Sequence, residues 1–179
     1  RELRDHGHIY GVTTGYGDSV SRRVPPELVA ELPLHLSRFH GCGLGDILRP
    51  DQARAVLAVR LASLCTGYSG VSLDLLRQLA GLLEHDITPL IPEEGSVGAS
   101  GDLTPLSYVA AALIGERDVL YRGQKMTALD ALATSGLTPL TPRPKEALAI
   151  MNGTSVMAAM MCQAFVRADY LCRLTARIT

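Results

Sequence analysis

The sequence predicts a mainly α-helical fold, and three observations lead to this prediction. Apolar residues make up 47% of the 179 residues, whereas aromatic residues make up only 4% and Trp is absent. A core of Leu, Ala, Val, Ile and Met favours helices, because Ala, Leu and Met lose little conformational freedom on entering one. Leucines also recur at helical spacing in several segments, and glycine-rich stretches separate these segments.

The predicted helices begin at proline or capping signals and end near glycines. Prolines precede or open the first two, Ser72 caps the third, and the pair Thr104-Pro105 opens the fourth. The helices are predicted over residues 27–38, 50–67, 72–86 and 104–113, with a last one from 144 to beyond 169 that is kinked near Asn152-Gly153. The stretch 87–103 is predicted to be irregular, and a minor β-hairpin is expected around Arg122-Gly123.

Three glycine-rich loops separate the predicted helices, at residues 7–19, 41–45 and 95–102. The first carries Tyr10 and Tyr16 and is expected to be mobile, because four glycines in thirteen residues disfavour a helix or a strand. Loops on a rigid helical frame are where binding and catalytic residues concentrate, so function is expected here.

The charge balance and the cysteines argue against several classes of function. Lys and Arg total 17 and Asp and Glu total 18, which gives no electrostatic case for binding nucleic acid or an anionic membrane surface. No apolar run predicts a signal peptide or a membrane span. The cysteines form no CxxC pair and have no His at ligand spacing, so no metal site is expected. Cys42, Cys65, Cys162 and Cys172 are interpreted as buried free thiols in a reducing compartment, which predicts a cytoplasmic protein.

The segment 95–102, Gly-Ser-Val-Gly-Ala-Ser-Gly-Asp, admits several interpretations. It is a plain flexible connection if its Gly and Ser residues only form turns. A serine nucleophile elbow needs Gly two residues before and two residues after the Ser, and Asp102 occupies the second place. A phosphate-binding loop would lack the Lys of a P-loop, which argues against a bound nucleotide.

A further possibility follows from the tripeptide Ala99-Ser100-Gly101. In a tightly bent loop the Gly101 nitrogen can reach the carbonyl carbon of Ala99, since glycine has no Cβ to block the approach. Loss of two waters, one from the ring and one from Ser100, gives a five-membered ring with a methylidene group, which is a strong electrophile. Asp102 beside it is a candidate to assist proton removal during this cyclisation.

Four motifs occur in order along the chain, and they read YGVTTGYG at 10–17, GYSG at 67–70, GSVGASGDLTPL at 95–106 and NGTS at 152–155. Together they closely resemble the aromatic amino acid ammonia-lyase and aminomutase family, which includes the histidine, phenylalanine and tyrosine ammonia-lyases. They span nearly all of this chain, and the family's chains are much longer. The resemblance implies that residues 1–179 are the N-terminal catalytic part of the family's helical fold, without a long C-terminal helical region.

The resemblance also implies roles for the matching residues. Ala99, Ser100 and Gly101 match the tripeptide that in the family cyclises into a methylidene-imidazolone (MIO), with no metal or nucleotide. Tyr10 matches the base that removes the substrate β-proton, and Asn152 matches the Asn that binds the MIO carbonyl region and the substrate carboxylate. Without the motifs, Tyr10 is an ordinary loop aromatic and Asn152 is part of a helix kink that satisfies its own polar groups.

Contacts with the amino acid substrate are implied by the same match. Gly17 and Leu103 are expected to lie against it. Phe39 and His40 fall at the pair that reads the substrate side chain, where phenylalanine lyases resemble Phe-Leu, tyrosine lyases His-Leu and histidine lyases Ser-His. His40 offers a hydrogen bond to a phenol or an imidazole, and Phe39 favours an aromatic ring. His40 is otherwise a surface residue near a helix end.

The sequence favours tyrosine or phenylalanine as the substrate. Thr13 replaces the Asn common in the first loop, a change associated with the tyrosine-acting branch, and residues 106–108 are closer to the phenylalanine and tyrosine enzymes. The expected activity is non-oxidative deamination to an arylacrylate and ammonia by a homotetramer. The alternatives are a histidine ammonia-lyase, a tyrosine 2,3-aminomutase, and a non-catalytic helical interaction module. The 179-residue chain alone is expected to be inactive or nearly so, because the family's active sites are assembled from several subunits.

Overall fold

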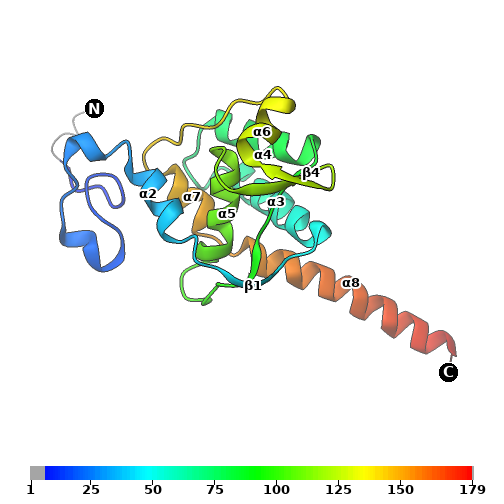
Figure 1. The fold of residues 1–179 in the computed structure, drawn as a ribbon. Coiled ribbons are helices and arrows are strands. Elements are labelled where there is room, and N and C mark those ends of the chain that lie inside the picture. Colours follow the sequence, from blue (N-terminus) through cyan, green and yellow to red (C-terminus); the bar gives the residue numbers. More distant parts are fainter. Residues whose placement is uncertain (1–6, 179) are drawn as a thin grey trace.

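The computed structural model describes residues 7–178 of the chain. Helices dominate the molecule, and short strands lie beside the helical body (Figure 1). The helices are α2 (Leu32–Phe39), α3 (Pro50–Cys65), α4 (Leu73–Glu84), α5 (Leu103–Leu113), α6 (Ala128–Thr134), α7 (Glu146–Met151) and α8 (Ser155–Ile178). The strands are β1 (Leu44–Ile47), β2 (Ile87–Pro89), β3 (Pro92–Glu94), β4 (Asp118–Tyr121) and β5 (Gln124–Thr127). Two 3₁₀ turns, Gly17–Ser21 and Pro26–Leu28, precede α2.

Helix α5 lies at the centre of the body, and its residues from Pro105 to Leu113 are all buried. It is apolar on every side, as expected for a helix that its neighbours cover completely. Helices α2, α4, α6 and α7 pack around it, and Leu79, Leu82 and Ile150 add fully buried side chains to the core. Each such side chain stabilises the fold by about 1.5 to 3 kcal/mol. The loops that carry the predicted site residues are attached to this packed body.

The hairpin predicted around Arg122 and Gly123 is confirmed as β4 and β5. The φ angles of its two turn residues are 50° and 82°, as a two-residue hairpin turn of type I′ requires. Strand β2 pairs with β4 to complete a three-stranded antiparallel sheet, and β1 and β3 form a separate antiparallel pair.

The prediction of an irregular stretch at 87–103 is wrong in part, because this stretch contains β2 and β3. Each strand has only three residues and includes a proline, so neither shows the alternating pattern of a longer strand. Partners distant in the chain supply the hydrogen bonds instead: Ile87 lies opposite Tyr121, and Glu94 lies opposite Leu44. The second glycine-rich loop, predicted at 41–45, overlaps the start of β1, because Leu44 pairs with Glu94.

The helices differ from the prediction in three places. The first helix begins at Leu32 rather than residue 27, because Pro33 occupies its first turn, where a missing N–H costs no hydrogen bond. Helix α6 is missing from the prediction, although Thr127 caps it by accepting a hydrogen bond from the Asp130 N–H at 3.1 Å. The kink predicted in the last helix is a complete break between α7 and α8.

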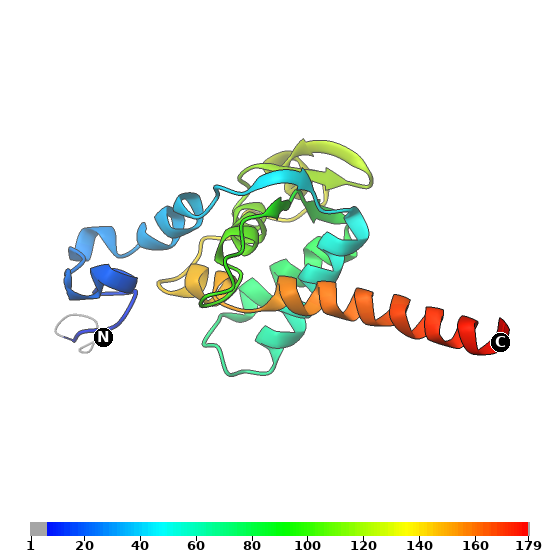
Figure 2. The same cartoon turned by 90° about the horizontal axis from the view of Figure 1, so that it is seen from below.

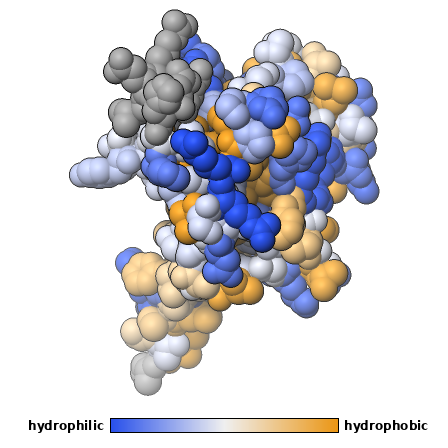
Figure 3. All heavy atoms as spheres, turned by 90° about the vertical axis from the view of Figure 1, so that its left-hand side faces the viewer, coloured by the Kyte–Doolittle hydropathy of each residue, from blue (hydrophilic) through white to orange (hydrophobic). Residues whose placement is uncertain are grey.

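Helix α8 projects from the body along most of its length (Figure 2). Ser155 and Ala159 are its buried residues. Its large exposed apolar side chains, which we call the α8 stripe, are Met157, Met161, Phe165, Val166, Tyr170, Leu171, Leu174 and Ile178. In Figure 3, orange side chains gather on the lower lobe that α8 forms. At 3.6 residues per turn these side chains are spread around much of the helix circumference.

The prediction of buried cysteines is wrong, because all four are exposed. Cys162 and Cys172 lie on α8, where little of the body reaches them. Cys65 ends α3, and Cys42 lies in the loop before β1. All four are free thiols, as predicted.

The region Glu146–Ile178, which contains α7 and α8, is long and apolar enough to cross a membrane by length and composition alone. The sequence predicts no span there, because polar residues interrupt the region. One such region is weak evidence, since core helices of proteins outside membranes pass the same test.

Candidate active site

The first glycine-rich loop is folded back on the residues that follow it. Gly15 N donates to the Arg22 carbonyl at 3.0 Å, and Val24 N donates to the Thr13 carbonyl at 2.9 Å. The Thr13 hydroxyl donates to the Gly7 carbonyl and accepts from Ile9 N, both at 2.8 Å. These bonds give a defined shape to a loop whose glycine content alone predicts mobility.

The two tyrosines of this loop lie edge to face, with ring centroids 5.9 Å apart and planes at 82°. The Tyr16 hydroxyl donates to the Gly11 carbonyl at 3.3 Å, and burial raises the pKa of Tyr16 to about 12, with a further contribution from Tyr10. The Tyr10 side chain is more open, with 42% of the residue exposed, and its hydroxyl oxygen accepts a hydrogen bond from Gly17 N at 3.0 Å. Tyr10 is therefore the better placed of the two to exchange a proton with a ligand. Lys145 Nζ lies 5.9 Å from the centroid of the Tyr10 ring.

The tripeptide Ala99-Ser100-Gly101 packs directly against the turn between α7 and α8. The side-chain amide of Asn152 donates a hydrogen bond to the Ser100 carbonyl. Gly101 has a φ of +118°, and a Cβ on it would lie 2.8 Å from Gly153 N and 2.9 Å from Asn152 Nδ2. Only glycine therefore fits at this position, both for its backbone angle and for the space available.

Asp102 follows the tripeptide and is 2% exposed. Its Oδ2 accepts from Val156 N at 2.9 Å and from Met157 N at 3.1 Å, and its Oδ1 accepts from the Ser96 hydroxyl at 2.8 Å. Asp102 therefore satisfies free N–H groups in the first turn of α8, where a negative charge is favourable. Its carboxylate points into these contacts, so the geometry favours anchoring of the loop over proton removal from the tripeptide.

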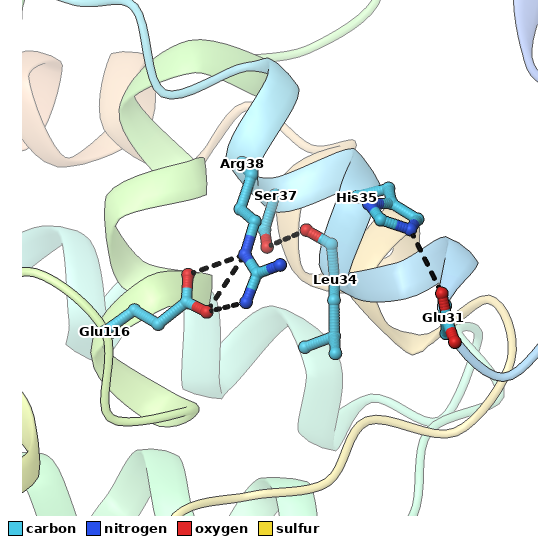
Figure 4. A network of polar contacts seen from close by, with 6 residues as sticks. All are labelled: Glu31, Leu34, His35, Ser37, Arg38 and Glu116. Atoms are coloured by element: carbon cyan, nitrogen blue, oxygen red, sulfur yellow. Dashed lines mark hydrogen bonds and ion pairs between the residues drawn. The ribbon is translucent and has the colours of Figure 1, made fainter.

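Helix α2 carries the pair predicted to read the substrate side chain. Figure 4 shows how α2 is held: Arg38 Nε donates to Glu116 at 3.0 Å, and the Ser37 hydroxyl donates to the Leu34 carbonyl at 2.9 Å. Glu116 follows α5, so this ion pair ties the end of α2 to the central helix. The same anchoring sets the position of Phe39, which ends α2, and of His40 after it.

His40 Nδ1 lies 3.1 Å from the Leu36 carbonyl oxygen. A carbonyl only accepts, so Nδ1 carries the proton and, in the neutral ring, Nε2 has the free lone pair. Phe39 packs edge on against this ring, with centroids 5.2 Å apart, and is 81% exposed. The α2 end thus offers one apolar ring and one hydrogen-bond acceptor.

A cavity of about 580 Å³ brings most of the predicted residues together. Its lining includes Tyr10, Gly17, Phe39, His40, Ser100, Leu103 and Asn152. Ala99, Gly101 and Asp102 flank Ser100 without lining the cavity. This volume lies within the range usual for small-molecule sites.

Sequence reasoning gave no site role to the remaining lining residues, which are Gly15, Tyr16, Ser19, Leu32, His35, Leu36 and Leu148. His35 lies four residues before Phe39, hence on the same side of a helix, and this spacing is the signal that would have found it. Its Nε2 lies 3.4 Å from Glu31 (Figure 4). Within residues 7–178, no group of three or more His, Cys, Asp or Glu side chains is arranged to hold a metal ion.

Comparisons with known proteins match this combination of fold and motifs. The family model for aromatic amino acid lyases matches residues 1–179. A histidine ammonia-lyase of Bacillus subtilis is 42% identical over 178 residues, which cover 99% of this chain and 35% of the relative. The chain thus spans about a third of the length of the curated relatives that it matches.

Solved structures agree with the sequence match. The crystal structure of histidine ammonia-lyase from Trypanosoma cruzi has a TM-score of 0.86 and 35% identity, over 96% of this chain and 33% of that one. A tyrosine aminomutase from Streptomyces globisporus has a TM-score of 0.77 and 45% identity, over 85% of this chain and 28% of that one. On this evidence the chain belongs to the aromatic amino acid lyase family, a family of carbon–nitrogen lyases.

Proposed function

We propose that this chain is the N-terminal catalytic part of an ammonia-lyase that removes ammonia from an aromatic L-amino acid without an oxidant. The observation that carries the proposal is the shared cavity that Tyr10, Ser100 and Asn152 all line, with Asn152 bonded to the Ser100 carbonyl. A base, a hydrogen-bond donor and a cyclisable tripeptide are the parts that such an elimination needs, and all three line or flank one space.

The tripeptide fits the formation of an MIO group. Gly101 N would bond to the Ala99 carbonyl carbon with loss of one water, and Ser100 would lose its Cα hydrogen and its hydroxyl as a second water. The positive φ of Gly101 and the lack of room for a Cβ there support a bent backbone of this kind. The MIO group supplies an electrophile that takes up the substrate amine and turns it into a leaving group.

Tyr10 and Asn152 have different roles in this reaction. Tyr10 removes the β-proton, and the Gly17 N–H bond to its oxygen becomes charge-assisted once the phenol has lost its proton. Asn152 donates to the Ser100 carbonyl, and this hydrogen bond polarises the carbonyl. The polarised carbonyl makes the ring formed from the tripeptide a better electrophile. Asp102 keeps the loop attached to α8 throughout.

We propose L-histidine as the first substrate to test. The predicted preference for tyrosine or phenylalanine finds no support in the comparisons, whose curated relatives are named histidine ammonia-lyases at 41–42% identity. The free Nε2 of His40 also favours a side chain that donates a hydrogen bond, which an imidazole or a phenol does and a phenyl ring does not. Tyrosine aminomutase is the second candidate, because its solved structure shares 45% identity with this chain.

We further propose a homotetramer in the cytoplasm. Burial of the α8 stripe against other subunits, or against chain beyond residue 179, would remove a large apolar surface from water. The free thiols support a reducing compartment.

Intact-mass measurement on the full-length protein tests the proposed function. We expect a mass lower by two waters, restored in Ser100→Ala, and release of ammonia with an arylacrylate from histidine. An unmodified mass would instead favour a non-catalytic helical module. A β-amino acid formed from tyrosine would favour the aminomutase.

Substitution of His40 tests the choice of substrate. We expect His40→Leu to lower kcat/KM for histidine about tenfold or more, the factor that loss of one ordinary hydrogen bond produces, with a smaller effect on phenylalanine. His85, the half-buried C-cap residue of α4, does not line the cavity and provides the matched control, so His85→Leu should leave both values unchanged. Equal losses on both substrates would contradict the proposed contact.

A further inference from the structure

Arg60 is a buried charge on α3 that the proposed chemistry does not use. The residue is 3% exposed, and burial lowers the pKa of its guanidinium, while the nearby Asp102 carboxylate opposes this shift. Burying a guanidinium is costly unless hydrogen bonds and an opposite charge compensate for the lost water. The contacts of the Arg60 guanidinium therefore indicate the role of this residue.

The Arg60 guanidinium lies beneath the segment that joins α7 to α8. Nη2 donates to the Ala149 carbonyl, and Nη1 donates to the Ser155 hydroxyl at 3.4 Å. Between these two points, a Cβ on Gly153 would collide with the guanidinium. Nε has no hydrogen-bond partner within residues 7–178. Arg60 thus holds both ends of the segment and fills the space under its centre.

The opposite side of the same segment holds the tripeptide. The Gly153 carbonyl accepts a hydrogen bond from Asp102 N at 2.7 Å, and the Asn152 amide donates to the Ser100 carbonyl. Gly101 approaches Gly153 so closely that a Cβ has no room. Gly153 thus lies between the Arg60 guanidinium and the tripeptide, and it contacts the tripeptide at Gly101.

We propose that Arg60 is a positioning residue that holds the Asn152–Gly153 turn against Ala99-Ser100-Gly101 and so keeps this backbone bent for ring closure. The proposal rests on the proposed function. In the step concerned, Gly101 N bonds to the Ala99 carbonyl carbon and its oxygen leaves as water, and the Ser100 hydroxyl leaves with the Cα hydrogen as a second water. Arg60 touches neither reacting group and acts through the turn.

An arginine is suited to this task because its planar guanidinium carries donors that point in different directions. A lysine would place a single ammonium group and reach one of the two partners. An apolar side chain of similar size would stabilise the core at least as well as a buried charge, so packing alone does not explain the residue.

The test compares Arg60→Lys and Arg60→Met with wild type in the full-length protein. The control is Arg54→Met, which removes a partly exposed arginine from the same helix, where it bonds Asp86 at 2.7 Å. The measured quantity is the rate at which two waters are lost after synthesis, followed by intact mass on protein whose fold is checked by circular dichroism. Activity and KM are measured afterwards on the fraction that has lost both waters.

We expect dehydration about tenfold slower in Arg60→Lys and slower still in Arg60→Met, the scale that loss of one hydrogen bond gives, and a normal rate in Arg54→Met. KM of the dehydrated fraction should stay unchanged. Folded Arg60→Lys that dehydrates at the wild-type rate would overturn the proposal. If Arg60→Met does not fold, Arg60→Lys and Ser155→Ala decide the question, because each removes fewer contacts. A wild-type protein that never loses two waters would contradict the proposed function instead.

Discussion

The side-chain amide of Asn152 donates a hydrogen bond to the carbonyl oxygen of Ser100, 52 residues earlier in the chain. This contact joins the break between α7 and α8 to the third glycine-rich loop. It also directs a donor at the oxygen that would gain negative charge if the tripeptide became an electrophile.

Asn152→Ala should therefore lower kcat by about 10² to 10³, the usual cost of removing one donor from a developing negative charge. The measurement is steady-state kinetics on protein whose loss of two waters has been checked by mass. Gln163→Ala is the matched control, since this amide on α8 donates to the Asp51 carbonyl at 3.2 Å. Equal kcat values for Asn152→Ala and wild type would refute the role given to Asn152.

Tyr10→Phe should lower kcat by about 10² to 10⁴, as expected when a general base is removed. Tyr16→Phe should have a much smaller effect, because Tyr16 bonds only the Gly11 carbonyl and stays protonated at neutral pH. The two variants remove the same atom from the same loop, so a common structural effect would appear in both. A larger loss in Tyr16→Phe would reverse the assignment.

Alkaline pH should destabilise the fold through Tyr16. Below pH 10 the phenol is protonated in both the folded and the unfolded chain. Between the ordinary pKa of 10.0 and the folded value of about 12, the unfolded state loses its proton first, so rising pH favours unfolding. The unfolding midpoint measured across this window should fall less in Tyr16→Phe than in wild type. Identical slopes would show that Tyr16 does not contribute.

Charge on the α8 stripe should disrupt assembly. Phe165 is 69% exposed, and Phe165→Glu would place a carboxylate among the exposed apolar side chains of the stripe. We expect smaller species in analytical ultracentrifugation of the full-length protein. Arg77→Glu, at an exposed position on α4, should leave the mass of the assembly unchanged. A Phe165→Glu protein of wild-type mass would exclude the stripe from the interface.

Much of the helical frame could be predicted because its signals are local. Pro50 opens α3, Ser72 caps α4, and positive φ values at Arg122 and Gly123 form the predicted hairpin turn. The short strands β1, β2 and β3 could not be predicted, because their stability comes from partners about 30 to 50 residues away rather than from their own residues.

The residues of the candidate site were also predictable only in part. Its motifs identify Tyr10, Ser100 and Asn152 one by one, and no spacing rule connects them. His35 and Arg60 carry no motif and become visible only when α2 and α3 pack against their neighbours. The exposure of Cys162 and Cys172 is likewise a property of how far α8 extends from the body.

By itself the sequence determined which residues are available for chemistry and where helices begin, because side-chain type and capping act over a few residues. Only the tertiary structure decided that Asp102 faces α8 and that Arg60 lies beneath Gly153. These relationships depend on the packing of segments that are distant along the chain, and a local pattern carries no information about such distances.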